Sequence, residues 1–245
     1  MIQRSLDCLL SGIALLVLAP LFIVVILILR MSGEGEVFYR QTRIGRGGAP
    51  FRLLKFATML KNSPQMGTGT LTIKDDPRVL PVGRFLRRTK INELPQLLNI
   101  IRGDMSLIGP RPQTARCFNA FPLSAQRAII RVRPGLSGIG SIVFRAEEEI
   151  LRGSLDPDQA YDTQIMPFKG ALEEWYVRNQ GLRTYALLIV LTLRVLLDPR
   201  SSGSWRFFPD LPRPPAPLAP FLNAGDDSHD PERALKVSGP LRQGK

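Results

Sequence analysis

The chain has 245 residues, which is room for one domain with appendages, and carries a formal net charge of +12 at pH 7. With two cysteines far apart and one histidine, it excludes a disulfide framework or a zinc site and argues against Ser-His or Cys-His catalysis. Residues 31–115 hold 14 Lys/Arg against six Asp/Glu. This predicts a basic surface for anionic lipid, nucleic acid or a phosphate-rich small molecule, with a solvated face that binds no ligand as the alternative.

The first predicted element is a membrane segment. Residues 9–29 run 21 positions without a charge, and a straight helix of that length measures roughly 31 Å, about one hydrocarbon thickness. Pro20 stands in the middle of the run and predicts a bend, because proline removes a backbone donor and clashes with the preceding turn. Since Arg4 and Arg30 place positive charge on both flanks, a kinked span and a re-entrant hairpin fit these residues equally well.

Strand and helix patterns follow the membrane segment. The stretches 37–41 and 50–56 flank a glycine-rich turn and predict a β-hairpin. Over residues 83–102 apolar side chains recur at helical spacing, with Pro95 as a start or a kink. The apolar stretch 185–197 has 13 residues, too few to span a bilayer, and fits either a core helix or an interfacial helix. Beyond Asp198 lie nine of the 21 prolines, so this tail is expected to be extended or flexible.

Cationic residues gather in the sequence around one acid, Glu93. They are Lys55, Arg84, Arg87, Arg88, Lys90, Arg111 and Arg133. Arginines hold phosphate oxygens in bidentate geometry, and a carboxylate binds magnesium, so this set suits a phosphate-rich substrate bound through Mg²⁺. A nucleic-acid groove is not expected, because such grooves interleave aromatic residues and Phe85 is the only one within 74–112. The plainer alternative is that Glu93 merely pairs with an arginine on a helix surface.

The chain also carries an ordered series of short motifs after its apolar segment. They are V-F-Y-R-Q, I-G-R-G-G-A-P-F, L-K-F-A-T-M, D-D-P-R-V, G-R-F-L-R-R-T, N-E-L-P-Q-L-L-N, G-D-M-S-L-I-G-P-R-P and R-P-G-L-S-G. Together with the central proline of the apolar segment, this series resembles the bacterial sugar transferases, also called monotopic phosphoglycosyl transferases. The resemblance covers roughly residues 1–198, and so many ordered motifs make chance an implausible explanation.

The resemblance implies a reaction and a set of partners. A sugar-1-phosphate would pass from a UDP-sugar to undecaprenyl phosphate, releasing UMP and starting O-antigen, capsule or exopolysaccharide assembly. Glu93 would help to hold Mg²⁺ beside the residue at position 92, and the cations would hold phosphate. The protein would lie in the bacterial inner membrane, in contact with its lipids and with the catalytic domain facing the cytoplasm. Neither the transferred sugar nor a homo-oligomer is settled by these residues.

The resemblance also implies the fold. An α/β (α+β) architecture is expected, with an N-terminal re-entrant membrane helix hairpin broken near Ala19-Pro20. A small, mainly helical catalytic domain with a short β-hairpin and interfacial amphipathic helices would follow. The expected division is a membrane anchor at 1–32, the catalytic domain at 33–198 and a proline-rich tail at 199–245.

Three motifs depart from the family pattern. Most members carry an Asp-Glu dyad before L-P-Q, in which the aspartate attacks the donor's β-phosphate, but here the pair is Asn92-Glu93. A carboxamide is a poor nucleophile, so this covalent step is not expected at residue 92. Ala57 replaces a cation of the usual K-F-R-T-M or K-F-K-T-M, and S-G-I-G-S replaces the usual T-G-x-x-Q, with Ser137 and Ser141 at the changed positions.

Three hypotheses remain open on sequence grounds. They are an active phosphoglycosyl transferase, a catalytically silent homologue that binds lipid phosphate or nucleotide-sugar and scaffolds a glycan assembly complex, and a nucleic-acid-binding membrane protein. If the protein is active, either the lipid phosphate attacks the donor directly or another carboxylate attacks first. Glu147, Glu148 and Glu149 are candidates for a relocated acid, with a solvated charged helix start as the alternative.

Overall fold

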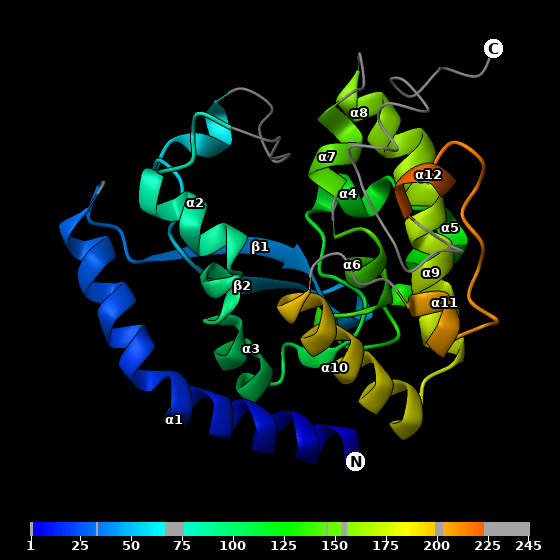
Figure 1. Cartoon of the computed structure of the whole chain (residues 1–245), viewed down its shortest axis with the longest axis horizontal. Coiled ribbons are helices and arrows are strands. Elements are labelled where there is room, and N and C mark those ends of the chain that lie inside the picture. The colour runs from blue at the N-terminus through cyan, green and yellow to red at the C-terminus, as the bar shows by residue number, and fades with distance from the viewer. Residues whose placement is uncertain are drawn as a thin grey trace.

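The computed structural model describes residues 2–32, 34–66, 76–145, 147–152, 156–198 and 203–222. In this part of the chain a long N-terminal helix precedes a mainly helical domain with two small two-stranded sheets (Figure 1). Through the first sheet and the helices after it, the elements are α1 (Ile2–Met31), β1 (Phe38–Ile44), η1 (Arg46–Gly48), β2 (Pro50–Phe56), η2 (Ser63–Gln65), α2 (Pro81–Arg88), η3 (Ile91–Glu93) and α3 (Gln96–Arg102). The remaining elements are β3 (Ser106–Ile108), α4 (Ala115–Asn119), α5 (Leu123–Ile129), β4 (Gly135–Ser137), α6 (Ile139–Val143), α7 (Glu147–Arg152), α8 (Pro157–Ala160), η4 (Tyr161–Ile165), α9 (Met166–Arg178), α10 (Leu182–Leu197), α11 (Ser204–Phe207) and α12 (Ala219–Leu222).

The predicted β-hairpin is confirmed. β1 and β2 pair antiparallel, with Tyr39 opposite Lys55 and Arg43 opposite Phe51. The connection bends at Gly47, whose φ of 71° falls in the left-handed region that favours glycine. Because paired residues and alternate residues of a strand share one face, Lys55 and Arg43 project from the same face of the hairpin.

The continuous helix predicted over residues 83–102 is wrong. The chain forms α2, breaks at Lys90, makes the short turn η3 and starts again as α3. Lys90 has a left-handed φ of 60°, which a continuing helix cannot accommodate, and Pro95 is the N-cap of α3, as its sequence position indicated. The break places Asn92 and Glu93 on a tight turn between two helices rather than on a helix face.

Close backbone approach positions the loop that carries Arg111. β3 and β4 pair in parallel, with Ser106 opposite Gly135. A Cβ atom on Gly138 would lie 2.1 Å from the carbonyl oxygen of Gly109, so only glycine permits this approach. The G-P-R-P and R-P-G-L-S-G segments are therefore held side by side.

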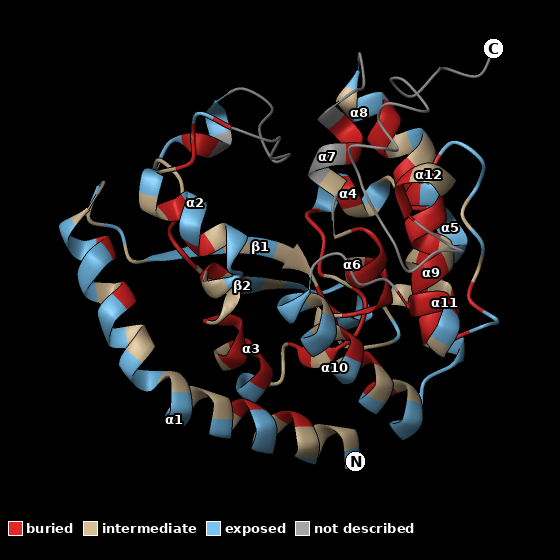
Figure 2. Cartoon of the chain, viewed as in Figure 1, coloured by how far each residue is buried: buried red, intermediate tan, exposed pale blue. Residues whose placement is uncertain are grey.

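The main core is built around α9. Figure 2 shows buried residues along most of this helix. Leu172 and Tyr176 of α9, Leu188 of α10 and Ile139 of α6 are among the buried side chains of one cluster. The side of α10 that faces away from the core is mainly apolar. Its exposed residues include Val190, Leu193, Leu196 and Leu197. The apolar stretch 185–197 therefore packs on the core with one side and leaves the other side uncovered.

Part of the proline-rich tail packs on the same core. Trp205 and Phe208 are buried, and the Phe208 ring lies 4.9 Å from the ring of Trp175 in α9. The indole nitrogen of Trp175 donates to Asp210. Residues 203–222 are thus not an extended or flexible tail, because aromatic and leucine side chains between the prolines supply apolar area for burial. Residues 223–245 lie outside the described residues, and the domain boundaries stay a prediction.

α1 is long and apolar enough to cross a membrane, and within the described residues it is the one helix with this property. It forms one helix with Pro20 inside, and Figure 1 shows it bent, as a proline at mid-helix requires. Much of its apolar surface is uncovered, including Leu16, Val17 and Ile23. The segment is thus one bent helix with an exposed apolar side, and its re-entrant placement in a membrane stays a prediction.

Both ends of α1 contact the same domain. Near its start, the buried carboxylate of Asp7 accepts hydrogen bonds from the Ser106 hydroxyl (3.0 Å), the Leu107 N–H (3.0 Å) and the Tyr185 hydroxyl (2.8 Å). Near its end, Leu29 is buried in a cluster with Phe56 of β2 and Leu86 of α2. The helix is therefore tied to the domain at its two ends.

We expect Asp7→Ala to lower the free energy of unfolding by about 3 kcal/mol or more, because three buried donors lose their acceptor. For a chain of this size, that corresponds to a fall in Tm of roughly 6–12 °C. Asp7→Asn keeps one oxygen acceptor and should lose less. Thermal unfolding in detergent micelles measures both, and an unchanged Tm for Asp7→Ala would contradict the proposed role of these bonds.

Candidate active site

A bidentate ion pair joins Glu93 to Arg111. The Arg111 Nη2 atom lies 2.6 Å from Glu93 Oε1 and its Nη1 atom lies 3.3 Å from Oε2. The Glu93 side chain is 12% exposed and that of Arg111 is 33% exposed. Glu93 is thus nearly enclosed and is not an acid on an open helix surface.

The charges around Glu93 favour its ionised form. Burial by itself would raise the pKa of this carboxyl, but the charges of Arg111 and Lys55 outweigh burial and hold the pKa well below its usual range. In turn, the Glu93 charge is the largest cause that raises the pKa of Arg111. The pair therefore keeps opposite charges at any physiological pH.

Two cations from the hairpin complete this cluster. The pKa of Lys55 is lowered to about 7, mainly by burial; the Glu93 charge opposes this effect, and the charges of Arg43, Arg111 and Arg87 add to it. Burial, followed by the Arg111 charge, lowers the pKa of Arg43 to about 10. Arg43 also donates to the carbonyl of Pro112, beside Arg111. Excess positive charge gathered in a partly buried place suits an anionic ligand with several phosphate oxygens.

Arg43 is a site residue that the sequence reasoning missed. The signal was the two-residue period of the hairpin, which places Arg43 and Lys55 on one face once their strand register is known. That register is set by the turn and is not visible in the residue types alone.

The predicted cations divide into two groups. The charges of Arg111 and Arg87 help to lower the pKa of Lys55, so these three residues belong to the cluster. Among the described residues, neither Arg88 nor Arg133 has a hydrogen bond or an ion pair with Glu93 or Arg111. Arg88 is exposed on α2, and Arg133 donates to the carbonyl of Gly103 at the C-terminal end of α3. The contact of Arg133 therefore supports the fold, since it satisfies a carbonyl that the helix leaves open.

Asn92 is buried on η3, next to Glu93. Its Oδ1 atom is buried and has no hydrogen-bond partner among the described residues. An unpaired buried carbonyl oxygen is costly and indicates a place for a bound donor or cation. The Glu93 carboxylate also keeps lone pairs beyond those that Arg111 uses.

These oxygens fit a magnesium ion that is shared with a substrate. Magnesium is usually held by one or two carboxylates together with substrate phosphates. No group of three or more His, Cys, Asp or Glu side chains gathers as a metal site in the part of the chain that the structure describes. An all-protein cage is therefore not indicated there, whereas Glu93 together with a diphosphate meets the chemical requirement.

A network of charged side chains lies behind the Arg111 loop. Glu173 of α9 is 1% exposed, and burial raises the pKa of its carboxyl to about 8, opposed by the Lys169 charge and by a hydrogen bond from the Arg111 backbone N–H. Lys169, one turn earlier on α9, forms an ion pair with Glu147 of α7. The charge of Glu147 also raises the pKa of Arg111. The side chains of Glu148 and Glu149 lie outside what the structure describes.

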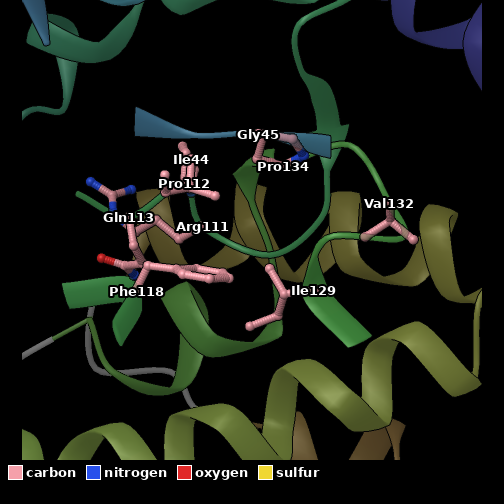
Figure 3. A pocket seen from close by; sticks show the side chains of 9 residues that line it. All are labelled: Ile44, Gly45, Arg111, Pro112, Gln113, Phe118, Ile129, Val132 and Pro134. Atoms are coloured by element: carbon pink, nitrogen blue, oxygen red, sulfur yellow. The ribbon is translucent and has the colours of Figure 1, made fainter. Parts of the chain in front are cut away.

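A small pocket lies against the other side of Arg111. Figure 3 shows the Arg111 guanidinium pointing away from Ile129 and Val132, which line the far end of this pocket. The lining residues are Ile44, Gly45, Arg111, Pro112, Gln113, Phe118, Ile129, Val132 and Pro134. The pocket is largely apolar, so the charged chemistry belongs to the side of Arg111 that faces Glu93.

Comparison with known proteins places this site in a family. Residues 1–199 match the model of the family described as bacterial sugar transferase. The chain is 35% identical to an exopolysaccharide production protein, ExoY, of Sinorhizobium fredii, over 82% of this chain and 87% of that protein.

Two further relatives carry the names of enzymes. The chain is 34% identical to a UDP-N-acetylgalactosamine-undecaprenyl-phosphate N-acetylgalactosaminephosphotransferase of Aeromonas hydrophila, over 80% of this chain and 44% of that protein. It is 38% identical to a UDP-glucose:undecaprenyl-phosphate glucose-1-phosphate transferase of Caulobacter vibrioides, over 57% of this chain and 53% of that protein. The family match spans the hairpin, the Glu93–Arg111 pair and the core helices, and the chain belongs to the bacterial sugar transferase family.

Proposed function

We propose that this protein transfers a sugar-1-phosphate from a UDP-sugar to undecaprenyl phosphate, releasing UMP and starting the assembly of O-antigen, capsule or exopolysaccharide. The observation that carries the proposal is the cationic cluster around the Glu93–Arg111 pair in a member of the sugar transferase family. Relatives named for undecaprenyl-phosphate sugar-phosphate transfer support the donor and the acceptor.

The cationic cluster binds and neutralises the negatively charged groups that take part in phosphoryl transfer. Arg111, Arg43 and Lys55 hold the donor's diphosphate oxygens and offset the charge that builds up as the phosphoryl group moves. Binding of a diphosphate beside Lys55 favours the protonated lysine, whose pKa is about 7 in the free protein. Magnesium, held through Glu93 when it is bound, supplies further neutralisation of the diphosphate.

Asn92 changes the chemistry at the position of the usual nucleophile. A neutral carboxamide does not readily form an acyl phosphate, so residue 92 contributes an oxygen or an N–H contact rather than a covalent bond to the substrate. Two routes remain, direct attack by the lipid phosphate or prior attack by another carboxylate. Both use the same cations to position the donor.

The membrane arrangement follows from α1. Because Asp7 near its start and Leu29 near its end both contact the domain, α1 enters and leaves the inner membrane on the domain's side, which is the cytoplasm. Its exposed apolar side, together with that of α10, rests in lipid. This placement brings the cluster to the surface where undecaprenyl phosphate presents its headgroup.

A screen of labelled UDP-sugars on membranes containing the protein tests the function. Lipid-linked product together with UMP release is expected for at least one sugar. Binding of the nucleotide-sugar without either product would instead support a catalytically silent homologue that scaffolds a glycan assembly complex, a reading that the amide at residue 92 also permits.

Substitution of Arg111 should lower turnover more than it lowers stability. Arg111→Lys keeps one positive charge but loses the two-pronged contact with carboxylate or phosphate, so turnover should fall by about 10²-fold or more. Arg127, exposed on α5, provides a matched control, and Arg127→Ala should behave as the wild type. Unchanged turnover in Arg111→Lys would place the site elsewhere.

Asn92 and Glu93 should respond in opposite ways. Glu93→Gln should lose nearly all activity, because a neutral amide binds a hard dication poorly and leaves Arg111 without its partner. Asn92→Ala should retain much of the activity, because residue 92 forms no covalent bond to the substrate. Product formation and Mg²⁺ dependence measure both effects. A labelled sugar-phosphate adduct on residue 92, or proof that deamidation of Asn92 accounts for all turnover, would refute this assignment.

Labelling at the N-terminus tests the membrane arrangement. A cysteine introduced at residue 2, in a background with Cys8 replaced by serine, should resist membrane-impermeant reagents applied to spheroplasts. It should react after permeabilisation, because both ends of α1 lie on the cytoplasmic side. Strong labelling from outside the intact membrane would instead establish a spanning helix.

A further inference from the structure

Three carboxyl groups in the described part of the chain lie close enough to Arg111 to act on its charge or its backbone. They are Glu93, Glu147 and Glu173. The Glu93 carboxylate accepts hydrogen bonds from both Nη atoms of the Arg111 guanidinium. Glu173 is 1% exposed and beyond the reach of a substrate. Glu147 differs from both, because its side chain is 24% exposed.

Only one of the two oxygens of the Glu147 carboxylate has a hydrogen-bond partner among the described residues. Lys169 donates from Nζ to its Oε2 atom, while Oε1 has no hydrogen-bond partner among the described residues. Lys169 is itself 4% exposed, and its ammonium group lies 5.2 Å from the centre of the Phe144 ring and 5.9 Å from that of Tyr161. A buried cation with aromatic neighbours has little freedom, so it fixes the orientation of Glu147.

Glu147 shares its surroundings with the phosphate-binding cluster. Tyr161 has a raised pKa because of burial and then the Glu147 charge, and the Arg43 charge acts on Tyr161 in the opposite direction. Arg43 also lies beside Arg111, through the carbonyl of Pro112. The charge of Glu147 thus reaches Arg111 of the cluster as well as Tyr161, and its open oxygen belongs to a carboxylate that Lys169 holds in place.

We propose that Glu147 is the catalytic nucleophile of this protein and takes the place of the aspartate that is absent at residue 92. The proposal rests on the proposed function, since it names the residue that attacks in that reaction. Glu147 Oε1 forms a bond to the donor's β-phosphorus, and the bond from that phosphorus to the oxygen bridging the two phosphates breaks. UMP leaves with that oxygen and its electron pair.

The second step returns the carboxylate. A phosphate oxygen of undecaprenyl phosphate attacks the same phosphorus, and Glu147 leaves with the electron pair of its acyl–phosphate bond. The product is undecaprenyl diphosphate carrying the sugar, and no oxidant or further reactant is needed. In the intermediate, the positive charges of Lys169 and Arg111 offset the negative charge of the bound phosphoryl group.

A trapping experiment tests the step. The full-length protein is incubated with a UDP-sugar carrying ³²P in the β-phosphate, with Mg²⁺ and without lipid acceptor, and is then quenched and digested with trypsin. Residue 92 falls in peptide 91–102 and Glu147 in peptide 146–152, so the two sites separate. We expect hydroxylamine-sensitive label on peptide 146–152, assigned to Glu147 rather than Glu148 or Glu149 by fragmentation.

Variants separate a nucleophile from a structural counter-ion. Glu147→Gln alone leaves Lys169 buried without a partner, so it is paired with a Glu147→Gln/Lys169→Met double variant that removes both charges. Lys169→Met alone keeps the carboxylate and should still form the adduct, whereas the double variant should form none and lose turnover by about 10³-fold or more. Glu174→Gln is the control, because the contacts of Glu174 in the described part of the chain are with Arg178 and the Ser124 hydroxyl and not with Lys169 or Arg111.

The outcomes are distinct. Label on peptide 146–152, absent from the double variant, supports the proposal. Label on peptide 91–102, turnover with no adduct in a rapid quench, or a double variant as active as Lys169→Met overturns it while leaving the proposed function intact. If the wild-type protein forms neither UMP nor lipid-linked product from any UDP-sugar, the proposed function fails and the nucleophile assignment fails with it.

Discussion

The ion pair between Arg111 and Glu93 joins parts of the chain that no local pattern would bring together. One partner sits on the turn η3 and the other on the loop after β3, and the two meet in a nearly enclosed place where an unmatched charge would be costly. Glu173 of the core helix α9 lies close enough to the Arg111 backbone for that backbone to lower the pKa of the Glu173 carboxyl. The hairpin supplies further cations from one face of its two strands. Without this pair, the positive charges would repel one another and the turn would have no fixed position.

Direct contacts connect both ends of α1 to the elements that form the site. Asp7 ties the start of α1 to β3 and to α10, and the end of α1 packs on β2, the strand that carries Lys55. A helix held in this way at both ends cannot rotate or slide independently of the strands that form the site. Under the proposed membrane arrangement, the depth of α1 in the bilayer fixes the height of the cationic cluster above the lipid headgroups, where the phosphate of the proposed acceptor lies.

Much of this structure is readable from the sequence, and the failures have physical causes. The hairpin and the apolar N-terminal helix with its proline bend follow from residue types and spacing, whereas the charges of Glu93 and Arg111 marked both as site candidates without showing that they pair. The break at Lys90 does not follow from residue types and spacing, because a left-handed lysine is rare and tertiary contacts outweigh helix propensity there. A phosphate-binding role of Arg133 stays a prediction, and nothing in its place along the chain indicated that its side chain donates to the carbonyl of Gly103. The pairing of Glu147 with Lys169 depends on how α7 meets α9, a long-range contact that no period in the sequence encodes.

Residues 203–222 extend the folded domain past the end of the family match. The family match stops at residue 199, yet Asp210 and Phe208 complete the surroundings of Trp175, a buried side chain inside the matched region. A chimera spliced at residue 199 would strip one wall from α9, the helix that also carries Lys169 and Glu173. A chimera that ends at residue 199 would expose Trp175 and would need a polar residue in its place. A chimera with its junction after residue 222 would keep Phe208 and Asp210 in contact with Trp175. In this protein, residues beyond the family match contribute buried side chains to the interior.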